Sequence, residues 1–341
     1  MAVPPERYGG TELMVYHLVE GLVERGHEVT LFATGDSQTS AELSHLYLEP
    51  QWPPDPLVDV NHVTWALQQI QQGEFDVLHS HTATALACNR LTPWLPMVYT
   101  IHHAQDVACS AFYRHFPDPY YVAISADQAR REVPLRRLEV IHHGLDHRDY
   151  QWTTSPRGDY VCFVGRFAAV KGVPAAIDAA ALAGVPIRVA GETHSIDAQF
   201  SECEVLPRLE LPHVTHLGSI GLAEKAPLLR DARALLAPLE WNEPFGLAMI
   251  EAMLSGCPVV AYPRGSVPEL VEHGVTGFIV HSLEEMAAVI RDGGPAERFD
   301  RRRCRARAVE RFDRARMVDA YERLYERAIE DVDTDAAVQI A

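Results

Sequence analysis

The chain has 341 residues and a formal charge of −17, with 47% hydrophobic and 23% charged side chains. This length is enough for two domains, and the composition is that of a soluble globular protein. An acidic protein repels nucleic-acid phosphates, so the charge argues against a nucleic-acid partner and favours a small ligand held by a few local cations. No apolar run of about 18 residues could span a membrane, and no signal peptide is visible.

Cysteine and histidine spacing argues against a disulfide framework or a metal site. The six cysteines form no CxxC pair, and we expect reduced, mostly buried thiols in a cytoplasmic protein. The histidines include the adjacent pairs His102–His103 and His142–His143, and none has helical metal-site spacing. Neighbouring residues on a strand point to opposite faces, so neither pair can chelate an ion there.

The first half of the chain alternates helices and strands. We expect helices at 11–25, 60–72, 83–91 and 107–115, and strands at 27–33, 75–79, 97–101 and 120–124. The segment 35–58 reads as a loop with little regular structure, and Ser125 with Gln128 resembles a helix capping box. Such alternation predicts an α/β fold with a parallel sheet and helices on both faces.

The start of the chain departs from a doubly wound sheet. In that fold a Gly-rich turn joins a central first strand to the first helix. Gly9 and Gly10 supply the turn, but too few residues precede them for a strand of normal length. Either the start lies upstream, or the N-terminal domain lacks its first strand.

The polar segment 147–158 suggests a boundary between an N-terminal domain at 1–146 and a C-terminal domain at 147–312. The same alternation restarts after it. We expect strands at 160–164, 186–190, 214–217, 234–237, 259–262 and 277–280, helices at 174–183, 224–232, 246–255 and 268–273, and charged helices from 283 to 332.

Two acids frame the predicted helix 246–255, which is apolar nearly all round and therefore expected inside the protein. Glu251 lies on this helix and Glu243 just before it. A carboxylate on a buried helix is costly unless something satisfies it, and a helix N-terminus suits phosphate. The alternative is that Glu251 meets a core arginine and Glu243 is a solvated loop acid.

Two basic residues follow the predicted strand 160–164. Arg166 and Lys171 can converge on one anion at the carboxyl end of that strand, where open α/β sheets bind ligands. A planar guanidinium and a compact ammonium both suit a diphosphate. The alternative is a pair of surface cations. The Gly9–Gly10 turn could also let the backbone approach an anion closely.

Taken together, EPFGLAMIE, GR-x4-KG, the GG turn and PRGSVPELV resemble the family-four retaining glycosyltransferases of the GT-B fold. The likeness also includes YGGTE, ERGHEVTLFA, FDVLHSH, YTIHH, IHHGLD and GVTGFIV. It implies two Rossmann-like domains facing a cleft, with a nucleotide-sugar donor mostly on the C-terminal domain and a hydroxyl acceptor mostly on the N-terminal one. It implies no metal and no cofactor beyond the donor substrate, and a C-terminal helix at about 313–332 that joins the first domain.

The resemblance assigns donor contacts by position. It implies that Glu251 accepts hydrogen bonds from the ribose hydroxyls, since two acceptor oxygens suit a cis-diol. Glu243 would hold hydroxyls of the transferred sugar near its anomeric carbon, as a candidate catalytic residue. Arg166 and Lys171 would neutralise the diphosphate leaving group.

The resemblance also assigns backbone groups and one histidine. The amides of Gly246 and Leu247 would add to diphosphate binding. His102 would lie near the sugar and acceptor, as the second candidate catalytic residue. Gly9 and Gly10 match the acceptor-side loop, which also approaches the donor phosphate.

Two positions depart from the family pattern. Val170 stands where many members have an acid, and His143 where many have asparagine. Two alternative functions remain open, a degenerate nucleotide-sugar binder and a GT-B nucleotide-sugar epimerase. The basic cluster 298–316 has interleaved acids, which favours a solvated helix face over peripheral membrane contact. The sequence identifies neither the nucleotide, sugar and acceptor nor the oligomeric state.

Overall fold

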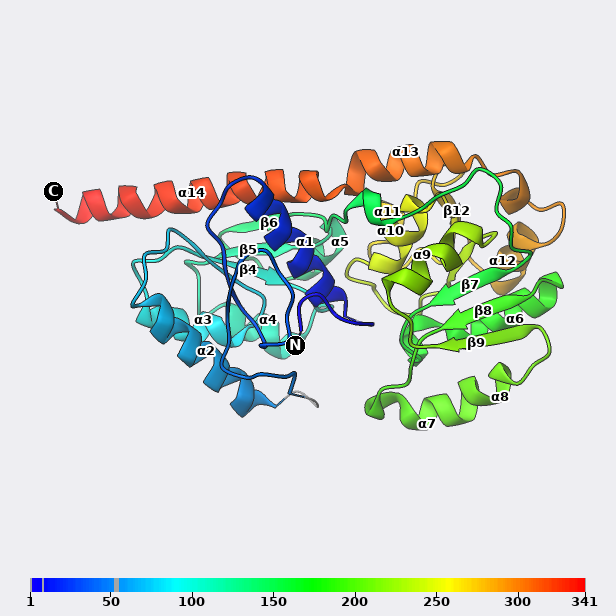
Figure 1. Ribbon diagram of the computed structural model, residues 1–341, viewed down its shortest axis with the longest axis horizontal. Coiled ribbons are helices and arrows are strands. Elements are labelled where there is room, and N and C mark those ends of the chain that lie inside the picture. Colours follow the sequence, from blue (N-terminus) through cyan, green and yellow to red (C-terminus); the bar gives the residue numbers. More distant parts are fainter. Residues whose placement is uncertain (1, 8, 52–54, 341) are drawn as a thin grey trace. The chain divides into compact units, whose positions relative to one another are not determined.

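The computed structural model describes residues 2–7, 9–51 and 55–340, except the side chains of 332–340 (Figure 1). Tyr8 of the glycine-turn motif lies outside these residues. The chain forms two compact units, residues 1–144 with 314–341 and residues 145–313. Each unit is a parallel α/β structure, which confirms the predicted fold of two Rossmann-like domains. None of the described helices combines the length and apolar character that a membrane crossing requires.

Unit 1, residues 1–144 and 314–341, contains two sets of parallel strands, a β1–β2 pair and a sheet in the order β3-β4-β5-β6. The strands are β1 (Thr30–Phe32), β2 (Glu42–Ser44), β3 (Leu78–Ser80), β4 (Met97–Ile101), β5 (Tyr120–Ala123) and β6 (Leu138–Val140). The helices are α1 (Gly10–Glu24), α2 (Pro56–Ile70), α3 (Thr84–Cys88), α4 (Val107–Tyr113), α5 (Ala126–Arg131) and α14 (Arg314–Ile340). None of the described residues ahead of α1 forms a strand.

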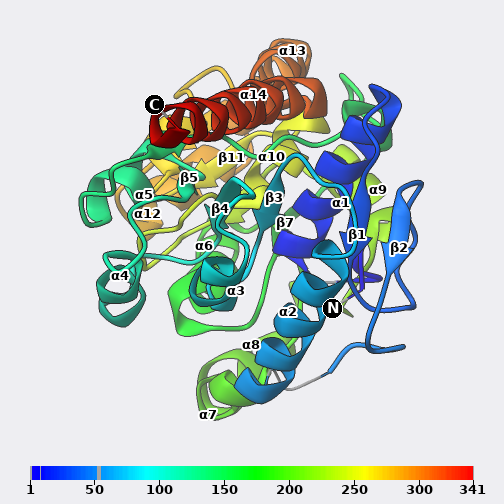
Figure 2. The same cartoon turned by 90° about the vertical axis from the view of Figure 1, so that its left-hand side faces the viewer.

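Strand β4 shows how the sheet of unit 1 separates two apolar layers. Val98 packs into a cluster with residues of α1 and α14, whereas its neighbours Met97 and Tyr99 pack into a cluster with residues of α2 and α4. This alternation is the period of two expected of a strand. Helices α1 and α14 touch closely, since a Cβ on Gly21 would lie 2.5 Å from Val318 Cγ2 (Figure 2). The long C-terminal helix is therefore part of the core of unit 1.

Unit 2, residues 145–313, has one six-stranded parallel sheet in the order β12-β11-β10-β7-β8-β9. The strands are β7 (Val161–Val164), β8 (Ile187–Ala190), β9 (Val214–Gly218), β10 (Leu235–Ala237), β11 (Val259–Ala261) and β12 (Gly277–Ile279). The helices are α6 (Val173–Ala183), α7 (Ala198–Phe200), α8 (Leu206–Leu209), α9 (Leu222–Asp231), α10 (Leu247–Leu254), α11 (Val267–Leu270), α12 (Leu283–Ile290) and α13 (Arg301–Phe312). Strands β7 and β10 are neighbours near the centre of this sheet.

The segment 35–58 is more regular than the sequence suggested. Its strand β2 pairs in parallel with β1, and Glu42 N–H donates to Val29 O at 2.9 Å. This pairing depends on how the loop between β1 and β2 brings the two strands together, so composition does not reveal it. The expectation for Ser125 is half correct. Its hydroxyl accepts from Gln128 N–H at 3.1 Å, but the Gln128 side chain accepts from Ile124 N–H instead of closing the capping box.

Candidate functional site

The site in unit 2 begins where strands β7 and β10 end. Because the strands are parallel neighbours, their carboxyl ends lie at the same edge of the sheet. The following loops are joined by a hydrogen bond from Glu240 N–H to Val170 O at 3.0 Å. Gly172 has φ +72°, and a Cβ there would lie 2.0 Å from Pro238 O, so the two backbones could not approach this closely with a larger residue. This contact places Lys171 beside the loop that precedes α10.

Lys171 and Glu243 form an ion pair at this corner. Lys171 Nζ lies 2.5 Å from Glu243 Oε2, and both side chains are largely buried. The indole N–H of Trp241 donates to the same oxygen at 2.9 Å, and the ammonium lies 4.8 Å from the centre of its ring. Sequence reasoning did not single out Trp241. The pattern E-W-N-E places it two residues before Glu243, which was the available signal.

The turn after β11 holds the backbone of this corner in place. Gly265 has φ +59°, and a Cβ there would lie 2.3 Å from both the amide nitrogen and the carbonyl oxygen of Glu243. Ser266 N–H donates to Glu243 O at 2.9 Å, and its hydroxyl donates to Phe245 O at 2.6 Å. Glu243 is therefore 7% exposed and held on both sides. The interpretation of Glu243 as a solvated loop acid is wrong.

Helix α10 starts directly beside this acid. Gly246 is its N-cap, with φ +92°, and a Cβ on Gly246 would lie 3.3 Å from Glu243 Cγ. Leu247 is the first helical residue, and its backbone N–H belongs to the first turn, where amides have no partner within the helix. The structure therefore brings Lys171, Glu243, Gly246 and Leu247 together at one helix N-terminus.

Glu251, on the same helix, is 2% exposed and has its own pair of partners. Lys225 Nζ of α9 lies 2.6 Å from Glu251 Oε1, and the Tyr150 hydroxyl donates to the same oxygen at 3.0 Å. The alternative that Glu251 meets a core arginine is wrong, since the cation is a lysine. Burial, with the adjacent Glu251 charge, raises the pKa of Tyr150 well above its usual value, so the phenol stays an O–H donor.

Arg166 and Lys171 lie next to different carboxylates. Arg166 Nε lies 3.3 Å from Asp197 Oδ2, whereas Lys171 pairs with Glu243. Neither Arg166 Nε nor Asp197 Oδ2 makes a hydrogen bond with another described residue. The two cations therefore face different carboxylates of unit 2, and their convergence on one diphosphate stays a prediction. Asp197 comes from a segment for which the sequence carried no prediction.

His102 lies in unit 1, just after β4, within a group of histidines. His102 Nε2 lies 3.0 Å from His81 Nδ1, and its ring stacks on His143 with centroids 5.5 Å apart. Burial lowers the pKa of His81 to about 4, and burial with the neighbouring His81 holds the pKa of His102 well below its usual value. These rings are therefore neutral, and one nitrogen of the His81–His102 pair donates a hydrogen to the other.

A second chain of hydrogen bonds ties the neighbouring His79 to α14. His79 Nδ1 lies 2.7 Å from the Tyr325 hydroxyl and Nε2 lies 2.8 Å from Thr100 Oγ1. Thr100 Oγ1 in turn lies 2.8 Å from the Tyr321 hydroxyl. The described residues contain no group of three or more His, Cys, Asp or Glu side chains arranged to hold a metal ion. Because burial lowers their pKa values, His79, His81 and His102 are uncharged, and each makes hydrogen bonds to neighbouring side chains.

The glycine turn of unit 1 caps the first helix. Gly9 is the N-cap of α1, and its carbonyl accepts from Leu13 N–H at 3.1 Å. A Cβ on Gly9 would lie 2.7 Å from Pro5 Cβ, so this close packing requires glycine. Gly10 opens the helix and is exposed. These two residues and His102 belong to unit 1, whereas the acids and cations described above belong to unit 2.

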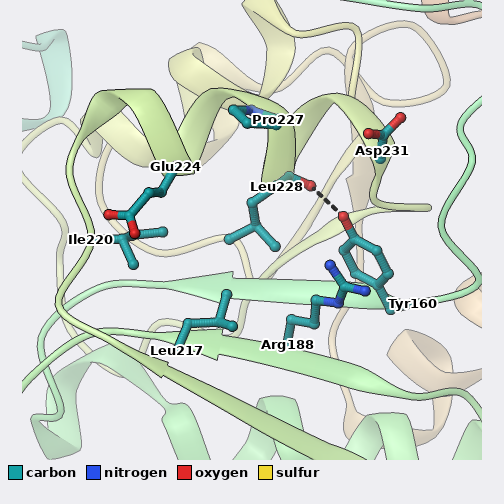
Figure 3. Close-up of a pocket in the computed structure, with 8 residues that line it drawn as sticks. All are labelled: Tyr160, Arg188, Leu217, Ile220, Glu224, Pro227, Leu228 and Asp231. Carbon is teal, nitrogen blue, oxygen red and sulfur yellow. Dashed lines mark hydrogen bonds between the residues drawn. The ribbon is translucent and has the colours of Figure 1, made fainter.

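A separate hollow of about 300 Å³ lies between α9 and the strands β7 to β9 (Figure 3). Its lining consists of Tyr160, Arg188, Leu217, Ile220, Glu224, Pro227, Leu228 and Asp231. The Arg188 guanidinium stacks 3.8 Å from the Tyr160 ring centre, and the Tyr160 hydroxyl donates to Leu228 O at 3.1 Å. None of the predicted site residues lines it.

Two family models match this chain, one in each half. Residues 8–149 match the model described as "Glycosyltransferase Family 4", and residues 158–292 match "Glycosyl transferases group 1". A D-inositol 3-phosphate glycosyltransferase of Mycolicibacterium gilvum is 28% identical over 322 residues, covering 80% of this chain and 70% of that protein. An uncharacterised glycosyltransferase of Methanocaldococcus jannaschii is 23% identical, covering 82% and 83%.

Solved structures match over nearly the whole chain. AviGT4, a glycosyltransferase involved in avilamycin A biosynthesis, has a TM-score of 0.73 at 22% identity and covers 96% of this chain and 93% of its own. Anabaena HepE, solved in complex with UDP and glucose, has a TM-score of 0.75 at 20% identity, with coverage of 94% and 97%. Sucrose-phosphate synthase from Thermosynechococcus elongatus has a TM-score of 0.80 at 18% identity, with coverage of 95% and 94%. At these identities the likeness shows the fold alone.

Proposed function

Because this glycosyltransferase belongs to family four and has the GT-B fold, we propose that it is a retaining enzyme that uses a nucleotide-diphosphate sugar and needs no metal. The observation that carries this proposal is the corner of unit 2 where Lys171, Glu243 and the N-terminus of α10 meet. An ammonium, unpaired backbone amides and a helix dipole suit a diphosphate, and an adjacent carboxylate suits sugar hydroxyls.

The donor groups follow from this arrangement. In the proposal, Lys171 and the amides of Gly246 and Leu247 bind the diphosphate, and Glu243 holds the sugar near its anomeric carbon. Glu251 accepts from the ribose hydroxyls. Arg166, which Asp197 neighbours at 3.3 Å, supplies a second positive charge. Fixed positive groups at the diphosphate stabilise the negative charge that develops on it as the sugar departs.

The acceptor groups belong to unit 1 in this proposal. The hydroxyl acceptor is held by His102 and by the loop at Gly9 and Gly10. His102 is neutral because burial and the neighbouring His81 lower its pKa, so it acts as a hydrogen-bond partner and not as a charge.

Retention follows if the acceptor attacks from the face that the phosphate leaves. The bond between the anomeric carbon and the phosphate oxygen breaks, and a bond to the acceptor oxygen forms on the same face. The acceptor's proton passes to an oxygen of the departing nucleoside diphosphate. No side chain forms a bond to the sugar in this sequence.

A panel of donors with an acceptor series tests the proposal. UDP-glucose is the first donor, because HepE was solved with UDP-glucose, followed by GDP- and ADP-sugars. The acceptor series begins with D-inositol 3-phosphate, because the relative from Mycolicibacterium gilvum carries that substrate in its name. Proton NMR of the product reports its anomeric configuration.

We expect the donor's anomeric configuration in the product and full activity in a chelator. An inverted product would contradict retention. A sugar trapped on a side chain would contradict direct attack, and loss of activity in a chelator would contradict metal independence. Conversion of the donor with no acceptor present would favour an epimerase.

A further inference from the structure

The two glutamates of the E-x7-E pair have matching surroundings. Glu243 Oε2 receives the Lys171 ammonium at 2.5 Å and the Trp241 indole N–H at 2.9 Å. Glu251 Oε1 receives the Lys225 ammonium at 2.6 Å and the Tyr150 hydroxyl at 3.0 Å. Each acid is thus held on one oxygen by one lysine and one neutral aromatic donor.

The second oxygen of each acid lacks such donors. No hydrogen bond from a described residue reaches Glu243 Oε1 or Glu251 Oε2. Both acids are less than a tenth exposed. Neither oxygen is among the buried polar atoms that lack a partner in the described part of the chain, so each reaches the surface, where a ligand hydroxyl can donate to it.

The choice of lysine supports the same interpretation. Lys171 and Lys225 are the only two lysines in the sequence, and the other basic residues among the 30 Lys and Arg are all arginine. An arginine fork bonds both oxygens of a carboxylate, whereas an ammonium acts as a point charge and can bond one. In a chain whose other basic residues are arginine, the two lysines each contact one carboxylate oxygen of Glu243 or Glu251 and leave the second oxygen without a donor.

We propose that Lys225, Tyr150 and Trp241 are positioning residues, which hold one oxygen of each glutamate so that the other accepts the hydroxyl groups of a nucleotide-sugar donor. Tyr150 and Lys225 act through Glu251 on the ribose, and Trp241 acts through Glu243 on the sugar. This inference rests on the proposed function and adds to it the groups that orient both acids.

The surrounding backbone fits this role. The Tyr150 carbonyl accepts from the Arg305 guanidinium at 2.9 Å, and a second nitrogen of Arg305 donates to His147 O at 2.9 Å. Tyr150 is 1% exposed, so its hydroxyl has a fixed direction. The Ser255 hydroxyl donates to the backbone carbonyl of Glu251 at 3.0 Å, which fixes the helix on which the acid stands.

The test for Glu251 compares two ligands that differ only in the ribose hydroxyls. Dissociation constants are measured for UDP and 2′,3′-dideoxy-UDP, or for the corresponding GDP or ADP pair if that nucleotide binds more tightly. The ratio between the two constants reports the contacts of the ribose hydroxyls. The variants are Tyr150→Phe, which removes one donor, and Lys225→Arg, which keeps the charge and offers a fork to both oxygens.

Tyr160→Phe is the matched control, because it removes another buried hydroxyl of unit 2 that donates to a backbone carbonyl. We expect the ratio to fall at least threefold in Tyr150→Phe and to approach one in Lys225→Arg, with no change in Tyr160→Phe. A general loss of packing would weaken both ligands equally and leave the ratio unchanged. An unchanged ratio in both variants, with UDP still bound by the wild type, overturns the positioning role alone. A wild type that binds no nucleoside diphosphate overturns the proposed function as well.

Trp241→Phe tests the other acid, since phenylalanine keeps a ring beneath the Lys171 ammonium but lacks the N–H. We expect kcat for sugar transfer to fall about tenfold, the effect of one hydrogen bond to a charged group, with the KM for the donor changed less. Trp152→Phe, at a partly exposed tryptophan of the same unit, is the control. An unchanged kcat in Trp241→Phe would remove Trp241 from the proposal.

Discussion

Lys171 Nζ lies 2.5 Å from Glu243 Oε2, so the cation expected to bind the diphosphate is paired with the acid expected to bind the sugar. Attraction between opposite charges at this distance is strong when solvent is largely excluded. A diphosphate that approaches Lys171 must share the ammonium with Glu243. Donor binding and the orientation of the acid are therefore linked through one nitrogen atom.

Replacing Lys171 by glutamine should weaken nucleoside diphosphate binding about 10- to 100-fold, the range expected for losing a charge-assisted contact. The measurement is calorimetric titration with UDP, GDP and ADP. The affinity should also become less sensitive to salt in the variant, because one positive charge has been removed. Equal affinities of wild type and variant would show that the diphosphate binds elsewhere.

Replacing Glu251 by glutamine should raise the KM for the donor about tenfold or more and change kcat less. The neutral amide accepts hydrogen bonds more weakly than a carboxylate, and the ribose contact is the same before and during reaction. Steady-state kinetics with varied donor at saturating acceptor measures both constants. A fall in kcat with an unchanged KM would mean that Glu251 acts in the chemical step and not in binding the ribose.

Alanine variants of two glycines with positive φ distinguish the cost of backbone strain from the cost of a steric clash. Gly184→Ala should lower the free energy of unfolding by about 1 kcal/mol, since φ is +69° but no atom lies within 4 Å of the new Cβ. Gly265→Ala should cost clearly more and also reduce donor affinity, because its Cβ would lie 2.3 Å from the backbone of Glu243. Urea unfolding and UDP titration of both variants make the comparison. Equal behaviour of the two would mean that the turn after β11 does not hold Glu243.

Acid should destabilise unit 1 through its histidines. The folded pKa of His81 is lowered by burial to about 4, and that of His143, for the same first cause, to about 3. Because the unfolded side chains titrate near about 6.5, the unfolded state binds more protons between that value and the folded pKa. The stabilisation is present above about pH 6.5 and is lost as the pH falls through this range, by up to about 1.4 kcal/mol per pH unit for each histidine.

Unfolding free energies at pH 7.5 and 5.5 test this dependence. His81→Phe should show a smaller loss than wild type, since one titrating ring is absent and His81 no longer helps to lower the pKa of His102. A wild-type stability that is equal at both pH values would show that the rings are not held neutral.

Much of the fold was predictable because the period of the apolar residues is a local property. The helix expected at 246–255 is α10 at Leu247–Leu254, and the strand expected at 97–101 is β4 with those bounds. Strand β2 was not predicted, because only its pairing with β1 makes it regular. Its residues show no strong alternation of their own.

The side-chain partners at the site were less predictable than the elements that carry them. The sequence singled out Glu243, Glu251 and Lys171, but not that Lys225 of α9 meets Glu251. Which cation reaches which acid depends on how α9 packs beside α10, and no local pattern encodes it. The available signal was compositional, because a chain with so many arginines has only two lysines.

Those two lysines also make the central claim directly measurable. Reductive methylation with carbon-13 formaldehyde keeps their charge and labels only Lys171, Lys225 and the α-amino group, and the loss of a signal in Lys171→Gln assigns the Lys171 resonance. On titration with the nucleoside diphosphate that binds among UDP, GDP and ADP, we expect the Lys171 resonance to shift in a saturable manner. A nucleotide that saturates the protein while the Lys171 resonance stays in place would contradict the account.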